Sequence, residues 1–273
     1  MKEESYTLIA SKKDLASTTM SNYLINNKGF EALEHGSNIF ESKIHKNARL
    51  YVSNLELLSL DTLDVRVQRS KALIFLSKHE SAKKIPALTC HSTGNFSDNH
   101  FGGNPRELGL TFPSLQKNLI HRINSKKSLV PDYEISIEAT HHGPTSLQSP
   151  ILFVEIGSTA NQWADTNAAS ILCDAILEVI ATGFRSCDKV GIGLGGSHYP
   201  AKFNKLLLES EYGLATIAAK HNLTLVDHYM LEQMSSKSIE KVTHIVVDKK
   251  GLGKERTRIV HLIERYGLDI LSL

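Results

Sequence analysis

Three segments of this 273-residue chain place histidine beside glycine and hydroxyl residues, directly after an apolar run. They are Cys90–Asn95 (CHSTGN), Thr140–Thr145 (THHGPT) and Gly195–Pro200 (GGSHYP), and they contain His91, His141, His142 and His198. A neutral imidazole can accept a proton or bind zinc, and a neighbouring glycine lets the backbone approach a reacting group. If the apolar runs are parallel neighbouring strands, the four imidazoles meet at one edge of a sheet. The pattern therefore predicts a shared site for general base catalysis or metal binding.

A single carboxylate, Glu155, lies within the near-continuous apolar run Ile151–Gly157. An unpaired charge in a buried strand is strongly unfavourable, so Glu155 needs a partner, and the histidines of the three segments are the obvious candidates. Most other histidines lack such a context. We interpret six of them as structural or solvated, and leave two open. The six are His35, His45, His79, His221, His244 and His261, and the two are His100 and His228.

Several well-known catalytic motifs are absent from the sequence. It contains no G-x-S-x-G elbow, H-E-x-x-H pair or Walker loop, and the glycines of residues 191–196 lack the dinucleotide-binding spacing. We therefore expect no nucleotide cofactor. Without a serine elbow, an activated water is the expected nucleophile for any hydrolysis.

Basic residues occur mainly in pairs, although the net charge of the chain is only +2. With so small a net charge, nucleic-acid binding must depend on a local basic patch. Pairs of this kind are usually solvated loop residues, and they could hold a polyanion only beside the histidine cluster. The pairs are Lys12-Lys13, Lys83-Lys84, Lys126-Lys127 and Lys249-Lys250, with Arg256 and Arg258 near the end.

Short apolar runs alternate with longer amphipathic segments, which predicts an α/β fold with a mixed, largely parallel central sheet flanked by helices. No linker-like tract or repeat divides the chain, so we predict one domain, residues 1–273. Expected strands cover Tyr6–Ala10, Arg49–Ser53, Lys71–Ser77, Ile85–Cys90, Ile135–Ala139, Ile151–Gly157, Lys189–Leu194, Leu223–Val226 and Val242–Asp248. Expected helices cover Ser114–Asn124, Asn161–Thr182 and Arg256–Tyr266, with two more through Tyr23–Ile25 and Phe203–Leu207. The region near Gly213 is expected to break the last of these helices or to start another.

The composition is that of a globular protein, with 41% hydrophobic and 22% charged residues. The three cysteines are far apart and form no C-x-x-C pair, which argues against a cysteine-based zinc site and favours a reducing compartment. No apolar run is long enough for a membrane span, and the N-terminus lacks the pattern of a signal peptide. We expect a soluble, cytoplasmic protein that is a monomer.

Several motifs resemble the archaeal and plant-type D-aminoacyl-tRNA deacylase family. The resemblance runs in order along nearly the whole chain, and its most specific parts are Ala139–Thr145 (ATHHGPT) and the G-G-x-H-Y of Gly195–Tyr199. Further parts are Ile9–Ser17, His91–Asn95, Gly103–Pro105 and Phe153–Ser158 with Trp163. One segment departs from the family pattern: where Gly-His-Ile is typical, this chain has Ala215-Thr216-Ile217.

The resemblance implies a hydrolase that cleaves the ester between a D-amino acid, such as D-tyrosine, and the 3′ end of tRNA. It also implies a bound zinc ion and a fold similar to the phosphorylase and peptidyl-tRNA hydrolase class. The site that it implies consists of His91, Asn95, His141, His142, Glu155 and His198.

Within this site we predict that His141, Glu155 and His198 bind zinc, because zinc takes nitrogen and carboxylate ligands. His91 or His142 is expected to be the general base, with Asn95 or glycine N–H groups stabilising the oxyanion. The predicted tRNA-binding residues are Lys12, Lys13, Lys126 and Lys127. Two alternatives stay open: a zinc-dependent small-molecule amidase or nucleoside hydrolase, and a non-catalytic tRNA-binding protein.

Overall fold

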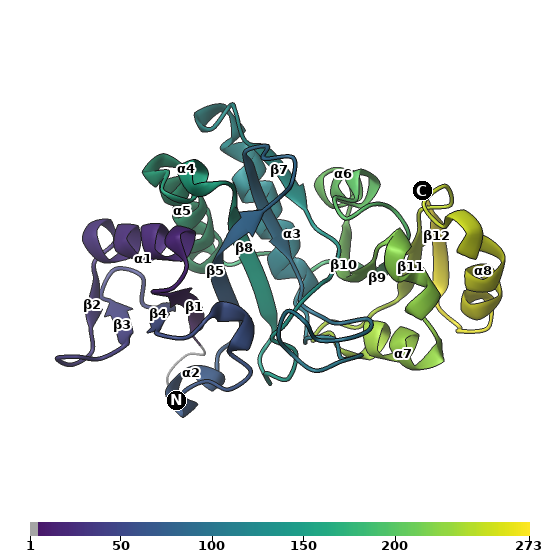
Figure 1. Cartoon of the computed structure of the whole chain (residues 1–273), viewed down its shortest axis with the longest axis horizontal. Coiled ribbons are helices and arrows are strands. Elements are labelled where there is room, and N and C mark those ends of the chain that lie inside the picture. The colour runs from purple at the N-terminus through teal and green to yellow at the C-terminus, as the bar shows by residue number, and fades with distance from the viewer. Residues whose placement is uncertain (1–4) are drawn as a thin grey trace.

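Two β-sheets flanked by helices make up the fold, described by a computed structural model for residues 5–273 (Figure 1). The larger sheet contains, in spatial order, β2 (Phe30–Ala32), β3 (Ile39–Ser42), β4 (Ala48–Ser53), β1 (Tyr6–Ser11), β5 (Leu73–Glu80), β8 (Ile151–Ser158), β6 (Ala87–His91) and β7 (Glu134–Ile137). The smaller contains β10 (Tyr212–Ala218), β9 (Lys189–Leu194), β11 (His244–Val247) and β12 (Asp269–Ser272). The smaller sheet is parallel throughout, whereas in the larger one β6 runs antiparallel to β8. The predicted α/β fold with a mixed, largely parallel sheet is confirmed.

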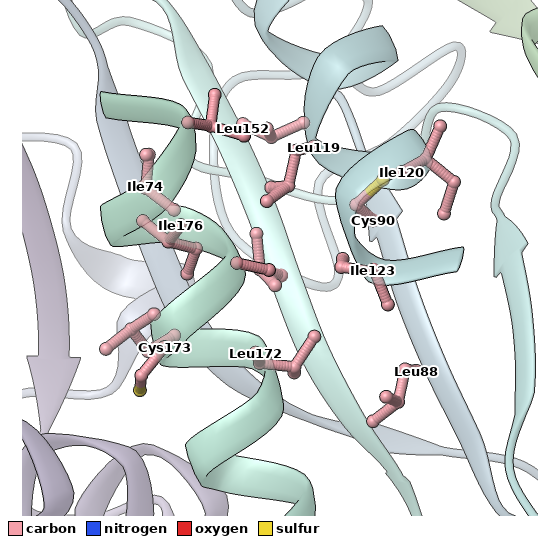
Figure 2. Packing of buried hydrophobic residues seen from close by; sticks show 14 of the residues in the cluster. Ile74, Leu88, Cys90, Leu119, Ile120, Ile123, Leu152, Leu172, Cys173 and Ile176 are labelled. Atoms are coloured by element: carbon pink, nitrogen blue, oxygen red, sulfur yellow. The ribbon is translucent and has the colours of Figure 1, made fainter. Parts of the chain in front are cut away.

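One face of the larger sheet is covered by α1 (Leu15–Asn27), α3 (Pro113–Ser125) and α5 (Thr166–Thr182). Figure 2 shows Leu172 and Ile176 of α5 on the side of the sheet that carries Leu152 of β8, with Leu119, Ile120 and Ile123 of α3 over the neighbouring part. Burial of one such side chain stabilises the fold by about 1.5–3 kcal/mol. Leu172→Ala would leave a cavity and cost about 2–5 kcal/mol. This apolar face holds the strands that carry the site.

The opposite face of the larger sheet is apolar near the start of β5 and β8 and polar further along these strands. Phe75 of β5 and Phe153 of β8 are paired in register and stack with ring centroids 4.7 Å apart. Leu57, Leu60, Leu63 and Val67 pack on them in a second cluster. Two residues further along, Ser77 pairs with Glu155. Because side chains alternate between the faces of a strand, these polar groups continue the same face, which is thus half apolar core and half polar.

The smaller sheet is flanked by α6 (Ala201–Glu209), α7 (His228–Ser236) and α8 (Arg256–Glu264) (Figure 1). Residues just after β7 join it to the larger sheet: Ala139 N–H donates to His198 O at 2.8 Å, and Thr140 N–H donates to Ile217 O at 3.0 Å. The short helices are α2 (Val65–Gln68), α4 (Ala160–Trp163), η1 (Leu57–Ser59), η2 (Lys127–Leu129), η3 (Lys220–Leu225) and η4 (Gly253–Glu255). The junction between the sheets therefore passes directly beside His141.

Three sequence predictions of secondary structure were wrong: the strand Leu223–Val226, the single helix Asn161–Thr182, and a helix break or helix start near Gly213, which lies in β10 (Tyr212–Ala218). The predicted strand Leu223–Val226 belongs to the 3-10 helix η3, and the nearby strand is β10, whose seven residues are all buried. A continuous apolar run of that length suits a strand buried on both faces. The predicted helix Asn161–Thr182 is two helices, because Asp165 caps α5 by accepting from Asn167 N and Ala168 N.

No helix among residues 5–273 is both long and apolar enough to cross a membrane. The predictions of one domain and of a monomer stay predictions.

Candidate functional site

A cavity of about 780 Å³ opens over the polar half of the sheet face. Six of the imidazole and carboxylate side chains that line it come from β5, β8 and the segments that follow β7 and β9. They are His79, Glu138, His141, His142, Glu155 and His198. A concave site with several convergent titratable groups is the usual form of a catalytic centre.

The convergence of the four predicted imidazoles is confirmed. The ring centroid of His141 lies 4.1 Å from that of His91, 4.4 Å from that of His142 and 4.6 Å from that of His198. The expectation that one sheet carries them was wrong, because β9 belongs to the smaller sheet. The backbone hydrogen bond from Ala139 to His198 brings the two segments together across the junction.

Backbone carbonyls orient three of these imidazoles. The distances from Nδ1 to the carbonyl oxygen are 3.1 Å in His91, 2.8 Å in His141 and 2.7 Å in His142, and the partners are Ser92, Ala139 and Gly143. A carbonyl only accepts, so Nδ1 carries a hydrogen in all three rings, and Nε2 keeps a lone pair wherever the ring is neutral. This is the form of histidine that binds a metal or accepts a proton.

Burial keeps two of these rings neutral. Burial, with the neighbouring His91, holds the pKa of His141 well below its usual range and lowers the pKa of His142 to about 3. His91 is fully buried behind them and stacks on Phe153 with ring centroids 5.4 Å apart. His141 and His142 face the cavity, whereas His91 supports them from the core.

His79 lines the cavity, although the sequence analysis did not place it in the site; its burial excludes the solvated interpretation and is compatible with the structural one. Its Nδ1 lies 3.2 Å from Glu138 Oε1 and 3.5 Å from Glu155 Oε2, and its Nε2 lies 2.9 Å from the Tyr199 hydroxyl. Burial lowers the pKa of His79, but the two carboxylates outweigh it and raise that pKa to about 10. His79 is therefore a buried cation between two buried anions.

Glu155 has the histidine partners that its buried position required. Besides His79, its Oε1 lies 3.7 Å from His91 Nε2. Burial raises the pKa of Glu155, yet these histidines outweigh it and lower the pKa below its usual range. Glu138, also missed, accepts a hydrogen bond from His198 Nε2 at 2.8 Å, and its pKa is held well below the usual range in spite of burial.

Side chains of the site could hold a metal ion in three groups, in each of which the ligand atoms lie within 4.8 Å of one another. The groups are His91 with His141 and His142, Glu138 with His141 and His198, and His79 with Glu138 and Glu155. The predicted zinc set of His141, Glu155 and His198 does not form one group. Glu155 lies within β8 opposite Thr89, whereas Glu138 precedes His141 by three residues and takes the place beside it and His198.

Two atoms of these groups are buried without a hydrogen-bond partner among the described residues: His91 Nε2 and Glu138 Oε1. Each nevertheless lies near an ionisable partner, Glu138 Oε1 at 3.2 Å from His79 Nδ1 and His91 Nε2 at 3.7 Å from Glu155 Oε1. The fit to a metal rests instead on the nitrogen and oxygen donors that the three groups bring together.

The predicted oxyanion residue Asn95 lines the cavity, but its amide is committed to the adjacent glycine loop. Asn95 Nδ2 donates to Gly102 O at 2.8 Å and to Asn104 O at 3.0 Å. Asn95 thus holds the loop that forms one wall of the cavity.

The predicted tRNA-binding lysines lie in two places. Lys12 and Lys13 are exposed and immediately precede Asp14, which lines the cavity. Lys126 pairs with Glu178 at 2.8 Å, and Lys127 donates to the carbonyls of Pro131 and Tyr133 before β7. The second pair therefore lies at the end of β7 away from the cavity.

Comparisons with known proteins show what this chain is similar to. A family model described as D-aminoacyl-tRNA deacylase matches residues 67–271. A D-aminoacyl-tRNA deacylase of Cenarchaeum symbiosum is 34% identical over 268 residues, covering 97% of this chain and 98% of the relative. One of Staphylothermus marinus is 35% identical over 271 residues, covering 97% of each chain. A crystal structure titled as a conserved protein of unknown function has a TM-score of 0.90 at 24% identity, covers 100% of this chain and 96% of that one, and thus shares the fold.

Proposed function

The chain belongs to the D-aminoacyl-tRNA deacylase family, and from this premise we propose that its histidine-lined cavity hydrolyses the ester of D-aminoacyl-tRNA. The products are the free D-amino acid, D-tyrosine among the candidates, and tRNA. The observation that carries the proposal is the convergence of imidazoles and carboxylates at the wall of one cavity. Its volume of about 780 Å³ is within the range of small-molecule sites, so the esterified end of the tRNA can enter it.

Zinc fits best between Glu138, His141 and His198. All three side chains line the cavity, unlike His91, so a ligand position can stay open toward the substrate. Two histidines and a glutamate are a known donor set of catalytic zinc. When bound there, zinc would polarise the ester carbonyl and lower the pKa of a water.

His142 is the proposed general base. It lines the cavity, and Gly143 O holds its Nδ1, so Nε2 keeps a lone pair. Because burial and His91 lower its pKa to about 3, it would take the proton only of a water made more acidic by zinc. His91 stacks on His141, and the His91 ring is held in place by Glu155, whose Oε1 lies 3.7 Å from His91 Nε2. Asn95 serves the reaction by holding the glycine loop over the cavity.

Lys12 and Lys13 are the proposed first contacts with tRNA outside the cavity. Both are exposed and follow β1 at the cavity rim, where an ammonium group could meet a phosphate. Lys126 and Lys127 are engaged elsewhere and are less suited to this role.

The proposal is tested by deacylation of D-tyrosyl-tRNA and L-tyrosyl-tRNA, each with and without a zinc chelator. We expect cleavage of the D-ester only, and its loss with the chelator and in His142→Ala. The exposed His35→Ala is the matched control, and it should retain full activity. Equal rates on both esters would refute stereospecific cleavage, and activity indifferent to the chelator would refute the zinc site. Turnover of a small ester that lacks the terminal adenosine of tRNA would instead favour a small-molecule hydrolase.

A further inference from the structure

A second hollow of about 870 Å³ adjoins the cavity, and His198 and His221 line both. Its walls come from the loop after β9, from η3 and from the loop between β11 and η4. Three lysines line it: Lys220, Lys250 and Lys254. Lys250 belongs to the basic pair Lys249-Lys250, which could hold a polyanion only if it lay beside the histidine cluster. Lys220 and Lys254 belong to no motif of the sequence analysis.

The positive charge of this hollow is not balanced by its own carboxylates. Asp248 pairs with Lys202 at 2.7 Å, and Glu255 pairs with Arg258 at 2.8 Å. In the described part of the chain, by contrast, the three lysines of the hollow form no ion pair. The hollow therefore presents three uncompensated ammonium groups next to the catalytic cavity.

Lys220 has a close contact with the backbone near the other two lysines. The side chain of Lys220 lies against Gly253, where a Cβ would come within 2.6 Å of Lys220 Cε. This contact sets Lys220 over the loop that carries Lys250 and Lys254. Cations that converge on a concavity suit phosphate, which has several oxygens to share among them.

We propose that this hollow binds the phosphodiester groups of the single-stranded 3′ end of the tRNA. The inference rests on the proposed function, because an ester at the catalytic imidazoles places the terminal nucleoside in the cavity. The preceding phosphates must leave that cavity, and the wall shared through His198 and His221 leads them into the lysine hollow. The hollow thus supplies affinity for the strand, while the cavity performs the chemistry.

The test combines three lysine substitutions with two forms of tRNA. Binding is measured by fluorescence anisotropy for intact uncharged tRNA and for tRNA that lacks its last three nucleotides. For Lys220→Ala/Lys250→Ala/Lys254→Ala, we expect about tenfold or greater loss of affinity for intact tRNA. The slope of log affinity against log salt should fall by about 0.7 for each lost contact. The truncated tRNA should bind both proteins equally.

The matched control removes three lysines far from the hollow: Lys43, Lys46 and Lys241. Lys43 and Lys46 lie between β3 and β4, and Lys241 lies before β11, at the end of that strand away from Lys250. This control should bind both tRNAs like the unaltered chain. An equal loss in the control, or an equal loss for truncated tRNA in the test variant, would overturn the proposal.

A third measurement separates this inference from the proposed function. D-tyrosyl-adenosine carries the ester and the terminal nucleoside but no phosphodiester, so its hydrolysis should be unchanged in the lysine variant. If it is lost together with tRNA binding, the lysines support the catalytic cavity and the inference fails. If the unaltered chain cleaves neither D-tyrosyl-tRNA nor D-tyrosyl-adenosine, the proposed function fails. The comparison of tRNA binding between the lysine variant and the unaltered chain then still decides whether the hollow binds the 3′ end.

Discussion

His79 Nδ1 lies 3.2 Å from Glu138 Oε1, and both side chains are almost completely buried. The Glu155 carboxylate approaches the same nitrogen at 3.5 Å. One imidazolium thus compensates two buried anions, and the carboxylates keep His79 charged by raising its pKa to about 10. This arrangement aims the Glu138 carboxylate at His198 and His141.

Replacing His79 should therefore be far more costly than replacing an exposed histidine. In His79→Gln the carboxylates of Glu138 and Glu155 lose their countercharge, and breaking such a buried pair costs about 3–5 kcal/mol of unfolding free energy. Urea denaturation at neutral pH measures this cost. His261→Gln is the control, because that ring is 74% exposed. A His79→Gln protein as stable as the control would show that the buried charges are compensated in another way.

Gly157 should tolerate no side chain, because the imidazole of His79 crosses it. A Cβ at this position would come within 2.4 Å of His79 Cδ2. Gly157→Ala should thus displace His79, lower stability and abolish deacylation. In the double variant Gly157→Ala/His79→Ala the clash is absent. Its loss of unfolding free energy should therefore be smaller than the sum of the losses in the two single variants. Strict additivity in this cycle would rule out the contact as the cause.

Local patterns were enough to predict the α/β fold and the meeting of four imidazoles. Each of these depends on an apolar run followed by a short histidine segment, which can be recognised without knowledge of the partners. The assignment of β9 to a second sheet could not be recognised this way, since it depends on pairing with β10 and β11, distant in sequence. The same holds for β10, whose apolar residues fit a strand or a helix equally well until the neighbours are known.

His79 and Glu138 were missed because neither follows the strand-end pattern. The available signal was alternation: Phe75, Ser77 and His79 occupy one face of β5, opposite Phe153, Glu155 and Gly157 of β8. Only the register between the strands shows that His79 and Glu155 share a face. The predicted zinc set contains Glu155 in place of Glu138 for the same reason, because a distance between β7 and β8 cannot be predicted from the sequence of either strand alone.

Metal content should distinguish the two glutamates. Glu138→Gln and His198→Ala should each weaken zinc binding by more than about 100-fold, since even the loss of an outer supporting group costs 10–100-fold. Glu155→Gln leaves Glu138, His141 and His198 in place and should retain zinc. Zinc per chain is measured by mass spectrometry after dialysis, with circular dichroism to verify folding. Zinc lost in Glu155→Gln but kept in Glu138→Gln would restore the ligand set first predicted from the sequence.

Glu107 should make the stability of the fold depend on acid pH. Its carboxylate accepts from Thr145 Oγ1 at 2.7 Å and Asn104 Nδ2 at 2.8 Å, and Lys237 Nζ lies 3.3 Å away. Burial raises the pKa of Glu107, but these partners outweigh it and lower the pKa below the ordinary value. A depressed pKa in the folded state means that the ionised form stabilises the fold above the unfolded-state pKa of about 4.3, and that this stabilisation is lost as the pH falls through the folded pKa.

Glu107→Gln should accordingly reduce the unfolding free energy by about 1.5–3 kcal/mol at pH 7, the contribution of hydrogen bonds to a charged group. The difference from the unaltered chain should stay constant down to about pH 4.3 and shrink at lower pH. Urea denaturation at a series of pH values measures it. Glu31→Gln, with a side chain 75% exposed, is the control and should show no such dependence. A Glu107→Gln difference of the same size at every pH would mean that the lost contacts are steric, because only an ionised carboxylate makes the effect depend on its own protonation.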